Sequence, residues 1–195
     1  MEKNMAGLDQ LASMQNELKL LENRTLFISE PITSAVAKRV VQQLLILETD
    51  SSASPVTVYI NSPGGEVNSG FAIYDTMRFI RPEVRVVNTG LCASIATIIN
   101  LGAPKKFRYS MPHAKFLIHQ PLIGGHIQGQ ASDLEITARE IIKTRKRINE
   151  LLSRECDQPF EKVEEDTVRD YWMNATEAVE YGLVAKVIEK IDEIG

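Results

Sequence analysis

The pattern of apolar and polar residues switches repeatedly between the spacing of a helix and that of a strand. In residues 7–21 the leucines recur at helical spacing: Leu8, Leu11, Leu18 and Leu21. This spacing predicts an amphipathic N-terminal helix. A short β-type run follows from Thr25 to Ile28, and residues 34–49 again carry their apolar side chains along one side of a helix.

A strand–loop–helix unit comes next. Residues 56–60 are β-branched and aromatic, which predicts a strand. They lead into Asn61-Ser62-Pro63-Gly64-Gly65, whose residue types are typical of a loop, and then into a helix that ends near Ile80.

The same order occurs a second time. Residues 84–87 predict a strand, residues 88–90 a turn, and residues 94–101 a helix. Further strands are predicted near Phe107 and over residues 116–118. Strands that alternate with helices indicate an α/β domain with a largely parallel sheet.

The segment from Gln130 to Glu155 predicts one unusually long helix. At 1.5 Å per residue it would reach about 39 Å, more than a domain of this size needs for its own core. Its apolar residues are spread over more than one face, so we expect a partner surface and hence an oligomer. The alternative is a helix that lies wholly across its own domain.

The last part of the chain has clear helix boundaries. Asn174 and Glu177 have the spacing of a capping box, and Gly182 suits the left-handed position after a helix. Residues 184–188 then predict a closing strand.

Composition excludes several classes of protein. The 195 residues are enough for one domain with a single core, and the net charge of −4 argues against a dedicated nucleic-acid binder. No apolar stretch approaches the roughly 20 residues that cross a bilayer, so we expect no membrane association. Cys92 and Cys156 have neither a disulfide framework nor metal-ligand spacing. We therefore expect a reducing, cytosolic location and no structural metal.

Ser94 is a candidate nucleophile. It follows the small residues of Gly90-Leu91-Cys92-Ala93, between a predicted strand and a predicted helix. This position would expose a hydroxyl at the carboxyl end of a sheet, beside the free N–H groups of a helix start. The alternative is that Ser94 only caps the helix.

Three further features could complete such a site. The glycines of residues 61–65 could present an N–H to an oxyanion, or could simply form a tight turn. His119 ends an apolar run at a predicted strand end and is the best placed general base. His113 begins that run, and His126 lies in a glycine-flanked loop. The alternative is that His119 is purely structural. Asp170 stands among aromatic residues near a predicted helix start and could orient an imidazole.

Eight short motifs together resemble one known family, ClpP, the peptidase subunit of the Clp protease. They lie in unbroken order between about Thr25 and Ile188. The motifs occupy residues 59–65, 73–77, 93–94, 118–121, 129–133, 138–141, 169–170 and 177–183.

The resemblance implies a ClpP/crotonase-type α/β fold of stacked β-β-α units with a long protruding handle helix. It implies a serine endopeptidase in which Ser94 attacks the scissile carbonyl, His119 takes its proton and Asp170 holds the imidazole tautomer. The backbone N–H groups of Gly65 and Ile95 would form the oxyanion hole. Residues 1–24 would be an N-terminal axial segment with an amphipathic helix, and residues 25–195 a single peptidase domain.

The resemblance also implies partners. The family stacks two heptameric rings into a chamber, interlocked by the handle helix, and a Clp-family AAA+ unfoldase feeds it unfolded polypeptides. Tyr59, Phe79 and Tyr109 match aromatic positions of the groove where the ATPase docks, and Gln130 and Arg169 are expected at ring–ring contacts. No cofactor is implied for this chain, because ATP is used by the partner.

The chain departs from the usual family pattern at four places. It has Ser94-Ile95-Ala96 where Ser-Met-Gly is usual, a longer loop over residues 122–128, and Val168 where many relatives carry an acid before Arg169. No axial-loop sequence is recognisable before Thr25. These departures resemble the divergent second ClpP of bacteria that encode two, so we expect a mixed assembly with a more typical ClpP.

Two other functions remain open at this point. The first is a non-catalytic structural subunit of a mixed ring, against which the intact serine, histidine and aspartate argue. The second is a crotonase-like acyl-CoA enzyme, which shares the fold and an oxyanion hole of two N–H groups but needs no such triad.

Overall fold

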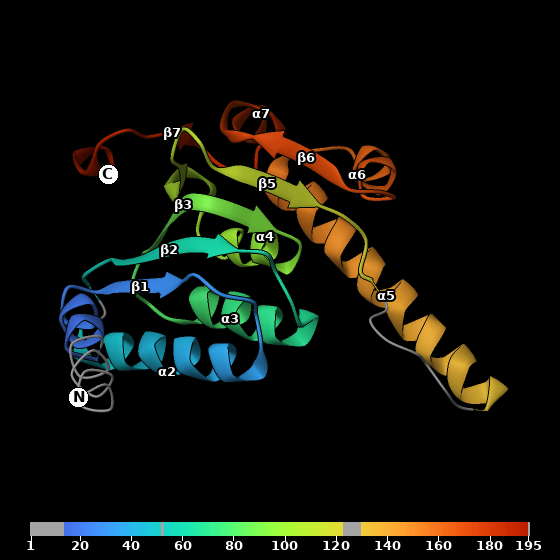
Figure 1. The fold of residues 1–195 in the computed structure, drawn as a ribbon, viewed down its shortest axis with the longest axis horizontal. Coiled ribbons are helices and arrows are strands. Elements are labelled where there is room, and N and C mark those ends of the chain that lie inside the picture. Colours follow the sequence, from blue (N-terminus) through green and yellow to red (C-terminus); the bar gives the residue numbers. More distant parts are fainter. Residues whose placement is uncertain (1–13, 52, 123–129, 195) are drawn as a thin grey trace, which may run out of the picture.

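The computed structural model describes residues 14–51, 53–122 and 130–194. Its strands form one seven-stranded sheet, drawn in Figure 1. Five strands pair in parallel in the order β1-β2-β3-β4-β7: β1 (Thr25–Ile28), β2 (Val56–Ser62), β3 (Val84–Ala93), β4 (Arg108–Ser110) and β7 (Lys186–Val187). Two more lie off this path: β5 (Lys115–Ile118), parallel to β3, and β6 (Tyr171–Asn174), antiparallel to β5.

The helices pack mainly beneath and beside this sheet (Figure 1). Residues 14–22 are helical and precede β1, whereas the part of the predicted N-terminal helix and axial segment before residue 14 lies outside the described residues. The longer elements are α2 (Ser34–Asp50), α3 (Val67–Phe79), α4 (Ile95–Asn100), α5 (Ala131–Cys156), α6 (Phe160–Asp166) and α7 (Ala175–Tyr181). Single 3-10 turns occur at η1 (Lys105–Phe107) and η2 (Ile191–Glu193).

Local patterns predicted several elements well. The strand from Thr25 to Ile28 has the expected bounds, and α2 begins at Ser34 as expected and ends one residue later than predicted. The buried side chains of α2 recur at the expected spacing. The capping box of Asn174 and Glu177 is confirmed, and Gly182 has the left-handed φ of 92°. The sheet is largely parallel, as the alternation of strands and helices indicates.

The turn predicted over residues 88–90 is wrong, because β3 continues through it to Ala93. Asn88 is buried, and its amide donates to the Asn100 side chain at 2.8 Å and to the Tyr109 carbonyl at 2.9 Å. Gly90 leaves room for the neighbouring strand, since a Cβ there would lie 2.6 Å from the Asn61 side-chain oxygen. These turn-forming residue types therefore serve tertiary contacts inside a strand.

Other boundaries also differ from the prediction. β2 includes Asn61 and Ser62, which we expected in a loop. β7 spans two of the five residues predicted for the closing strand. Neither α6 nor β6 was predicted, and Asp170 precedes the strand β6 rather than a helix.

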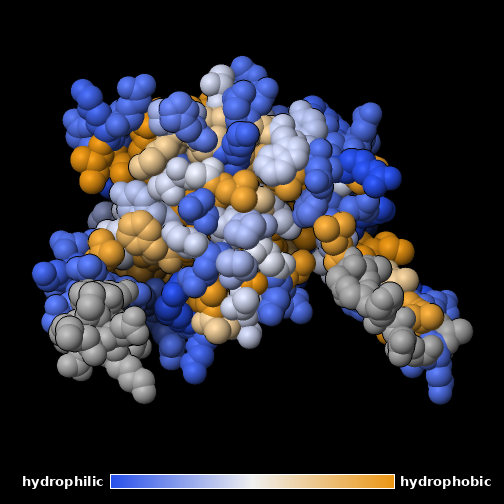
Figure 2. All heavy atoms as spheres, in the orientation of Figure 1, coloured by the Kyte–Doolittle hydropathy of each residue, from blue (hydrophilic) through white to orange (hydrophobic). Residues whose placement is uncertain are grey.

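The long helix α5 leaves the body of the molecule along half of its length (Figure 1). Ile148, Leu151 and Leu152 in its second half are buried in the core. In its first half Leu134 and Ile136 are 41% and 59% exposed, and Figure 2 shows apolar side chains along this projecting part. The helix therefore does not lie wholly across its own domain. None of the helices in the described residues is both long and apolar enough to cross a bilayer.

Candidate active site

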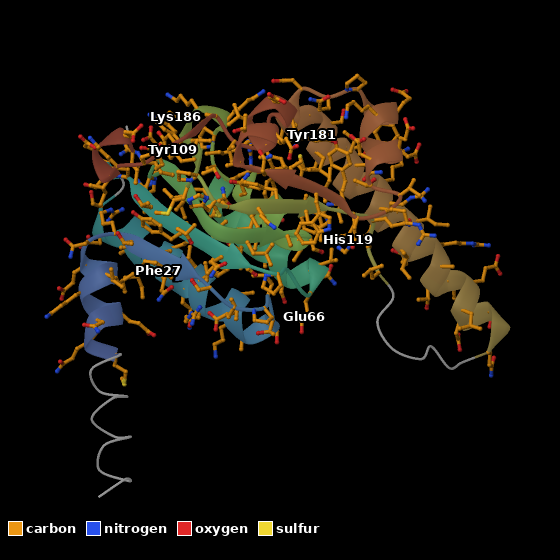
Figure 3. The ribbon with its side chains drawn as sticks, turned by 45° about the horizontal axis from the view of Figure 1, so that its top comes forward. Phe27, Glu66, Tyr109, His119, Tyr181 and Lys186 are labelled. Atoms are coloured by element: carbon orange, nitrogen blue, oxygen red, sulfur yellow. The ribbon has the colours of Figure 1, made fainter. Side chains whose placement is uncertain are left out.

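The carboxyl ends of β2, β3 and β5 meet at one edge of the sheet (Figure 1). Ser94 follows the last residue of β3, and His119 follows the last residue of β5. Glu66 precedes the first residue of α3, the helix after β2, and Figure 3 shows His119 and Glu66 toward this same edge. Because parallel strands bring their ends together, residues far apart in the sequence share one site.

Ser94 has a backbone conformation that is uncommon outside glycine, with φ 57° and ψ −127°. Its N–H donates to the carbonyl of Leu117 at 2.8 Å, which fixes the residue against β5. Its side chain makes no capping hydrogen bond to α4. The hydroxyl instead lies 2.8 Å from Nε2 of His119. The alternative interpretation of Ser94 as a simple helix cap is therefore not supported.

His119 joins Ser94 to Asp170. Its Nδ1 lies 3.2 Å from Oδ1 of Asp170, on the far side of the ring from the serine. The His119 side chain is 13% exposed and that of Asp170 is 63% exposed. With the proton on Nδ1, the ring donates to the carboxylate and leaves Nε2 free to accept from the serine hydroxyl. The three residues thus form one continuous chain of polar contacts.

The loop after β2 passes directly against the serine. A Cβ on Gly64 would lie 2.6 Å from the Ala93 carbonyl and 2.7 Å from Cβ of Ser94, so this close approach requires glycine. Gly65 has φ 154° and pairs with Ile32 in an isolated bridge. Within the described part of the chain, neither the N–H of Gly65 nor that of Ile95 donates to an acceptor. The two predicted oxyanion donors are therefore free.

A small apolar pocket of about 20 Å³ lies beside the serine and the histidine. Side chains of α3, α4 and α5 complete its wall: Val67, Ile95, Thr97, Ile98, Ile148 and Leu152. The side chain of Ile95 packs on Gly70 of α3, where a Cβ would collide with it. This contact between Ile95 and Gly70 was not predicted from the sequence.

The three residues predicted for the docking groove do not all meet within one chain. Tyr109 is buried in a small apolar cluster with Val87 and Ile188, and Tyr59 packs against the same cluster. Phe79 lies apart from them on α3 and is 81% exposed.

The two residues predicted for ring–ring contacts are both exposed. Gln130 precedes the first residue of the projecting helix, and Arg169 precedes Asp170. Among the described residues Arg169 has no ion-pair partner. The lengthened loop predicted over residues 122–128 lies, after its first residue, outside the described residues.

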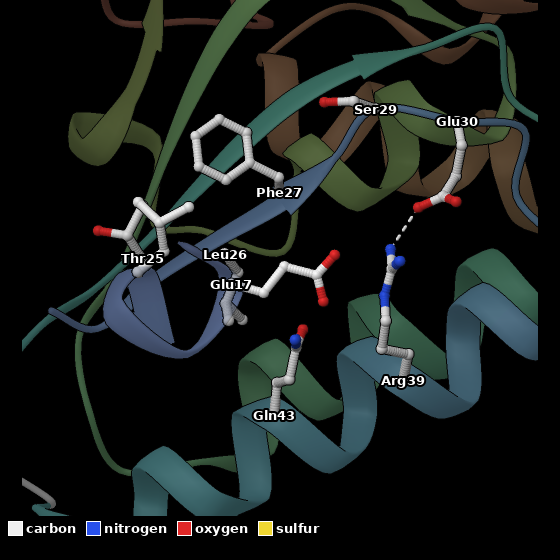
Figure 4. Close-up of a pocket in the computed structure, with 9 residues that line it drawn as sticks. Glu17, Thr25, Leu26, Phe27, Ser29, Glu30, Arg39 and Gln43 are labelled. Atoms are coloured by element: carbon white, nitrogen blue, oxygen red, sulfur yellow. Dashed lines mark hydrogen bonds and ion pairs between the residues drawn. The ribbon is translucent and has the colours of Figure 1, made fainter. Parts of the chain in front are cut away.

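A larger cavity of about 290 Å³ lies away from this site (Figure 4). It is formed between the helical residues 14–22, β1 and α2, and Arg39 forms an ion pair with Glu30 at its rim. None of the predicted catalytic residues lines it.

Two further features concern metals and thiols. In residues 14–51, 53–122 and 130–194, no group of three or more His, Cys, Asp or Glu side chains is arranged to hold a metal ion. Cys92 and Cys156 are free and buried, and burial raises the pKa of both thiols, that of Cys156 to about 12.

Comparison with known proteins agrees with this architecture. The family model described as Clp protease matches residues 9–191. A mutant of ClpP1 from Listeria monocytogenes is similar in structure, with a TM-score of 0.84 and 41% sequence identity. The alignment covers 92% of this chain and 99% of that one. This match decides against a crotonase-like acyl-CoA enzyme. The chain has the mixed α/β fold of ClpP and belongs to the Clp protease family.

Proposed function

We propose that this chain is a catalytically active subunit, a serine endopeptidase that hydrolyses peptide bonds of unfolded proteins. The observation that carries the proposal is the continuous contact from Ser94 through His119 to Asp170, at 2.8 and 3.2 Å. A purely structural subunit has no need to hold a serine in an unusual backbone conformation with its hydroxyl on an imidazole.

The mechanism follows from these positions. His119 Nε2 takes the proton of the Ser94 hydroxyl as the oxygen attacks the scissile carbonyl, and later gives it to the leaving amine. Asp170 holds the proton on Nδ1 and stabilises the imidazolium that forms. The free N–H groups of Gly65 and Ile95 would donate to the oxyanion, and one such donor is typically worth about 10²–10³ in rate.

The direct test is labelling with a fluorophosphonate, which reacts with activated serines. The native protein is treated, and the adduct is mapped by mass spectrometry. An adduct on Ser94 supports the proposal. No adduct, either alone or with a typical ClpP added, would leave the structural role as the better description.

The pocket beside Ser94 predicts the preferred residue before the cleaved bond. Because its volume of about 20 Å³ suits little more than a methyl group, we expect a preference for alanine over leucine. Replacing Ile95 with alanine removes the side chain that fills the space above Gly70 and should shift the leucine-to-alanine ratio of kcat/KM upward by about tenfold. Fluorogenic peptides that differ at this one residue measure the ratio.

A matched control separates pocket size from general damage. Ile99 is also a buried isoleucine of α4 but does not line the pocket, so Ile99→Ala should leave the ratio unchanged. An equal shift in both variants would contradict the assignment of the pocket.

Membership of the Clp protease family implies ring assembly with further ClpP chains and work with a Clp ATPase. We propose the more specific arrangement of a mixed assembly with a second, more typical ClpP. The projecting half of α5, with Ile136 and Ile142 exposed, supports a partner surface. The free, buried thiols are compatible with the cytosolic location, which stays a prediction.

The mixed assembly makes a measurable prediction. Adding a typical ClpP should increase both the fraction of this chain in double rings and its rate of fluorophosphonate labelling. Analytical ultracentrifugation and labelling of the same samples measure the two quantities. Stable double rings with full peptidase activity from this chain alone would contradict it.

A further inference from the structure

The side chain of Asp170 is held by few contacts. Its side chain is 63% exposed, and among the described residues the carboxylate has His119 as its only hydrogen-bond partner. It stands in a turn between α6 and β6, outside any helix or strand. Its position relative to the imidazole must therefore come from the backbone that carries it.

Gln120 holds that backbone at two points. Its N–H donates to the Thr167 carbonyl at 2.7 Å, and its side-chain amide donates to the Val168 carbonyl at 2.9 Å. Gln120 is the residue immediately after His119. Ile118 and Tyr171 already pair in the β5–β6 ladder on one side of His119 and Asp170. Gln120 therefore adds a second tie, on the other side, between the segment of the histidine and the segment of the aspartate.

The far end of the turn is anchored in the core. Thr167 is 1% exposed, and its hydroxyl donates to the Val163 carbonyl at 2.8 Å and contacts the Asn149 side-chain oxygen at 3.2 Å. From this fixed point the chain runs outward to Asp170 through exposed residues. The side-chain amide of Gln120 contacts this segment between Thr167 and Asp170, at the carbonyl of Val168.

We propose that Gln120 is a positioning residue of the triad. Its side-chain amide fixes the Val168 carbonyl and thereby keeps the Asp170 carboxylate within reach of His119 Nδ1. This inference rests on the proposed peptidase function and adds a residue that touches neither substrate nor the reacting atoms. Small displacements of catalytic groups lower rates steeply, and an error of about 1 Å can cost 10²-fold.

The test compares two glutamines. Gln120→Met keeps the length of the side chain and removes the donated hydrogen bond. Gln158→Met is the matched control, since the Gln158 amide donates to the Tyr181 carbonyl at 3.0 Å, away from the site. We expect Gln120→Met to lower kcat and the fluorophosphonate labelling rate by about tenfold with KM unchanged, and Gln158→Met to lower neither.

A double-mutant cycle distinguishes positioning from general damage. If Gln120 acts through Asp170, then Gln120→Met should change the labelling rate less than about twofold in an Asp170→Asn background. Gln120→Glu, which replaces the donor with an acceptor facing the Val168 carbonyl, gives a second variant with the same expectation. Thermal unfolding of each variant reports whether the fold is intact.

Several outcomes would overturn the inference. Wild-type rates in both Gln120 variants would do so, as would a loss of equal size with and without Asp170. In either case, a fluorophosphonate adduct on Ser94 of the wild-type protein would still support the proposed function. If the wild-type serine is not labelled, alone or with a typical ClpP, there is no triad to position and both proposals fail.

Discussion

Replacing Ser94 with alanine is expected to lower peptide hydrolysis by about 10⁴-fold or more, with the fold unchanged. The change removes the hydroxyl that lies 2.8 Å from His119 Nε2, and among the described residues no other hydroxyl or thiol contacts this imidazole. The residual rate would come from the oxyanion donors and from substrate binding. Hydrolysis of a short fluorogenic peptide, with and without a typical ClpP, measures the loss.

A second serine provides the control. Ser69 is buried and its hydroxyl donates to Glu66 Oε2 at 2.7 Å, but it has no contact with the histidine. Ser69→Ala should retain most of the activity. If Ser94→Ala kept the wild-type rate in a mixed assembly, the activity would belong to the partner and this chain would be structural.

Removing the carboxylate of Glu155 is expected to destabilise the protein by about 3–5 kcal/mol. Arg108 is 1% exposed, and its guanidinium lies 2.5 Å from Glu155 Oε2 near the end of α5. Its other hydrogen bonds go to neutral backbone carbonyls of Ala103, Leu101 and Glu155 itself. Glu155→Ala would therefore leave a buried charge without compensation.

Denaturant unfolding at fixed protomer concentration measures this effect. Glu135→Ala is the control, because the pair of Glu135 with Arg139 is exposed at both ends, and its loss should cost less than about 0.5 kcal/mol. The double variant Arg108→Met with Glu155→Leu should recover much of the loss, since apolar side chains of similar size need no pairing. A loss below about 1 kcal/mol for Glu155→Ala would show that water reaches the arginine.

Local sequence information was sufficient where structure depends on near neighbours. The apolar spacing of α2 and the cap of α7 involve residues within a few positions of one another, and both were predicted correctly. It failed where a residue serves a distant contact. Asn88 and Gly90 have turn propensity, but one donates to Tyr109 and the other accommodates Asn61 in a continuous strand.

In the candidate site too, features set by nearby residues were predicted and features set by distant contacts were not. The local sequence pattern predicted that Ser94 and His119 follow strands. It left open that Ser94 only caps a helix and that His119 is purely structural. Asp170 was selected mainly through the family resemblance, because its closeness to His119 depends on the antiparallel pairing of β5 with β6. β6 itself was not predicted. Gln120 could not be recognised, since its partner carbonyl lies 48 residues along the chain.

The position of β3 has a further consequence. Its first half pairs with β4 and its second half with β5, so the strand divides the sheet into two parts. Ser94 follows the last residue of β3, the strand common to both parts, whereas His119 follows β5 and Asp170 precedes β6. If the β5–β6 pair shifted along β3 by one residue, about 3.3 Å, the serine would separate from the histidine. The pairing of β5 with β6 would stay intact. The distance between Ser94 and His119 is thus sensitive to any displacement of the β5–β6 pair relative to the rest of the sheet.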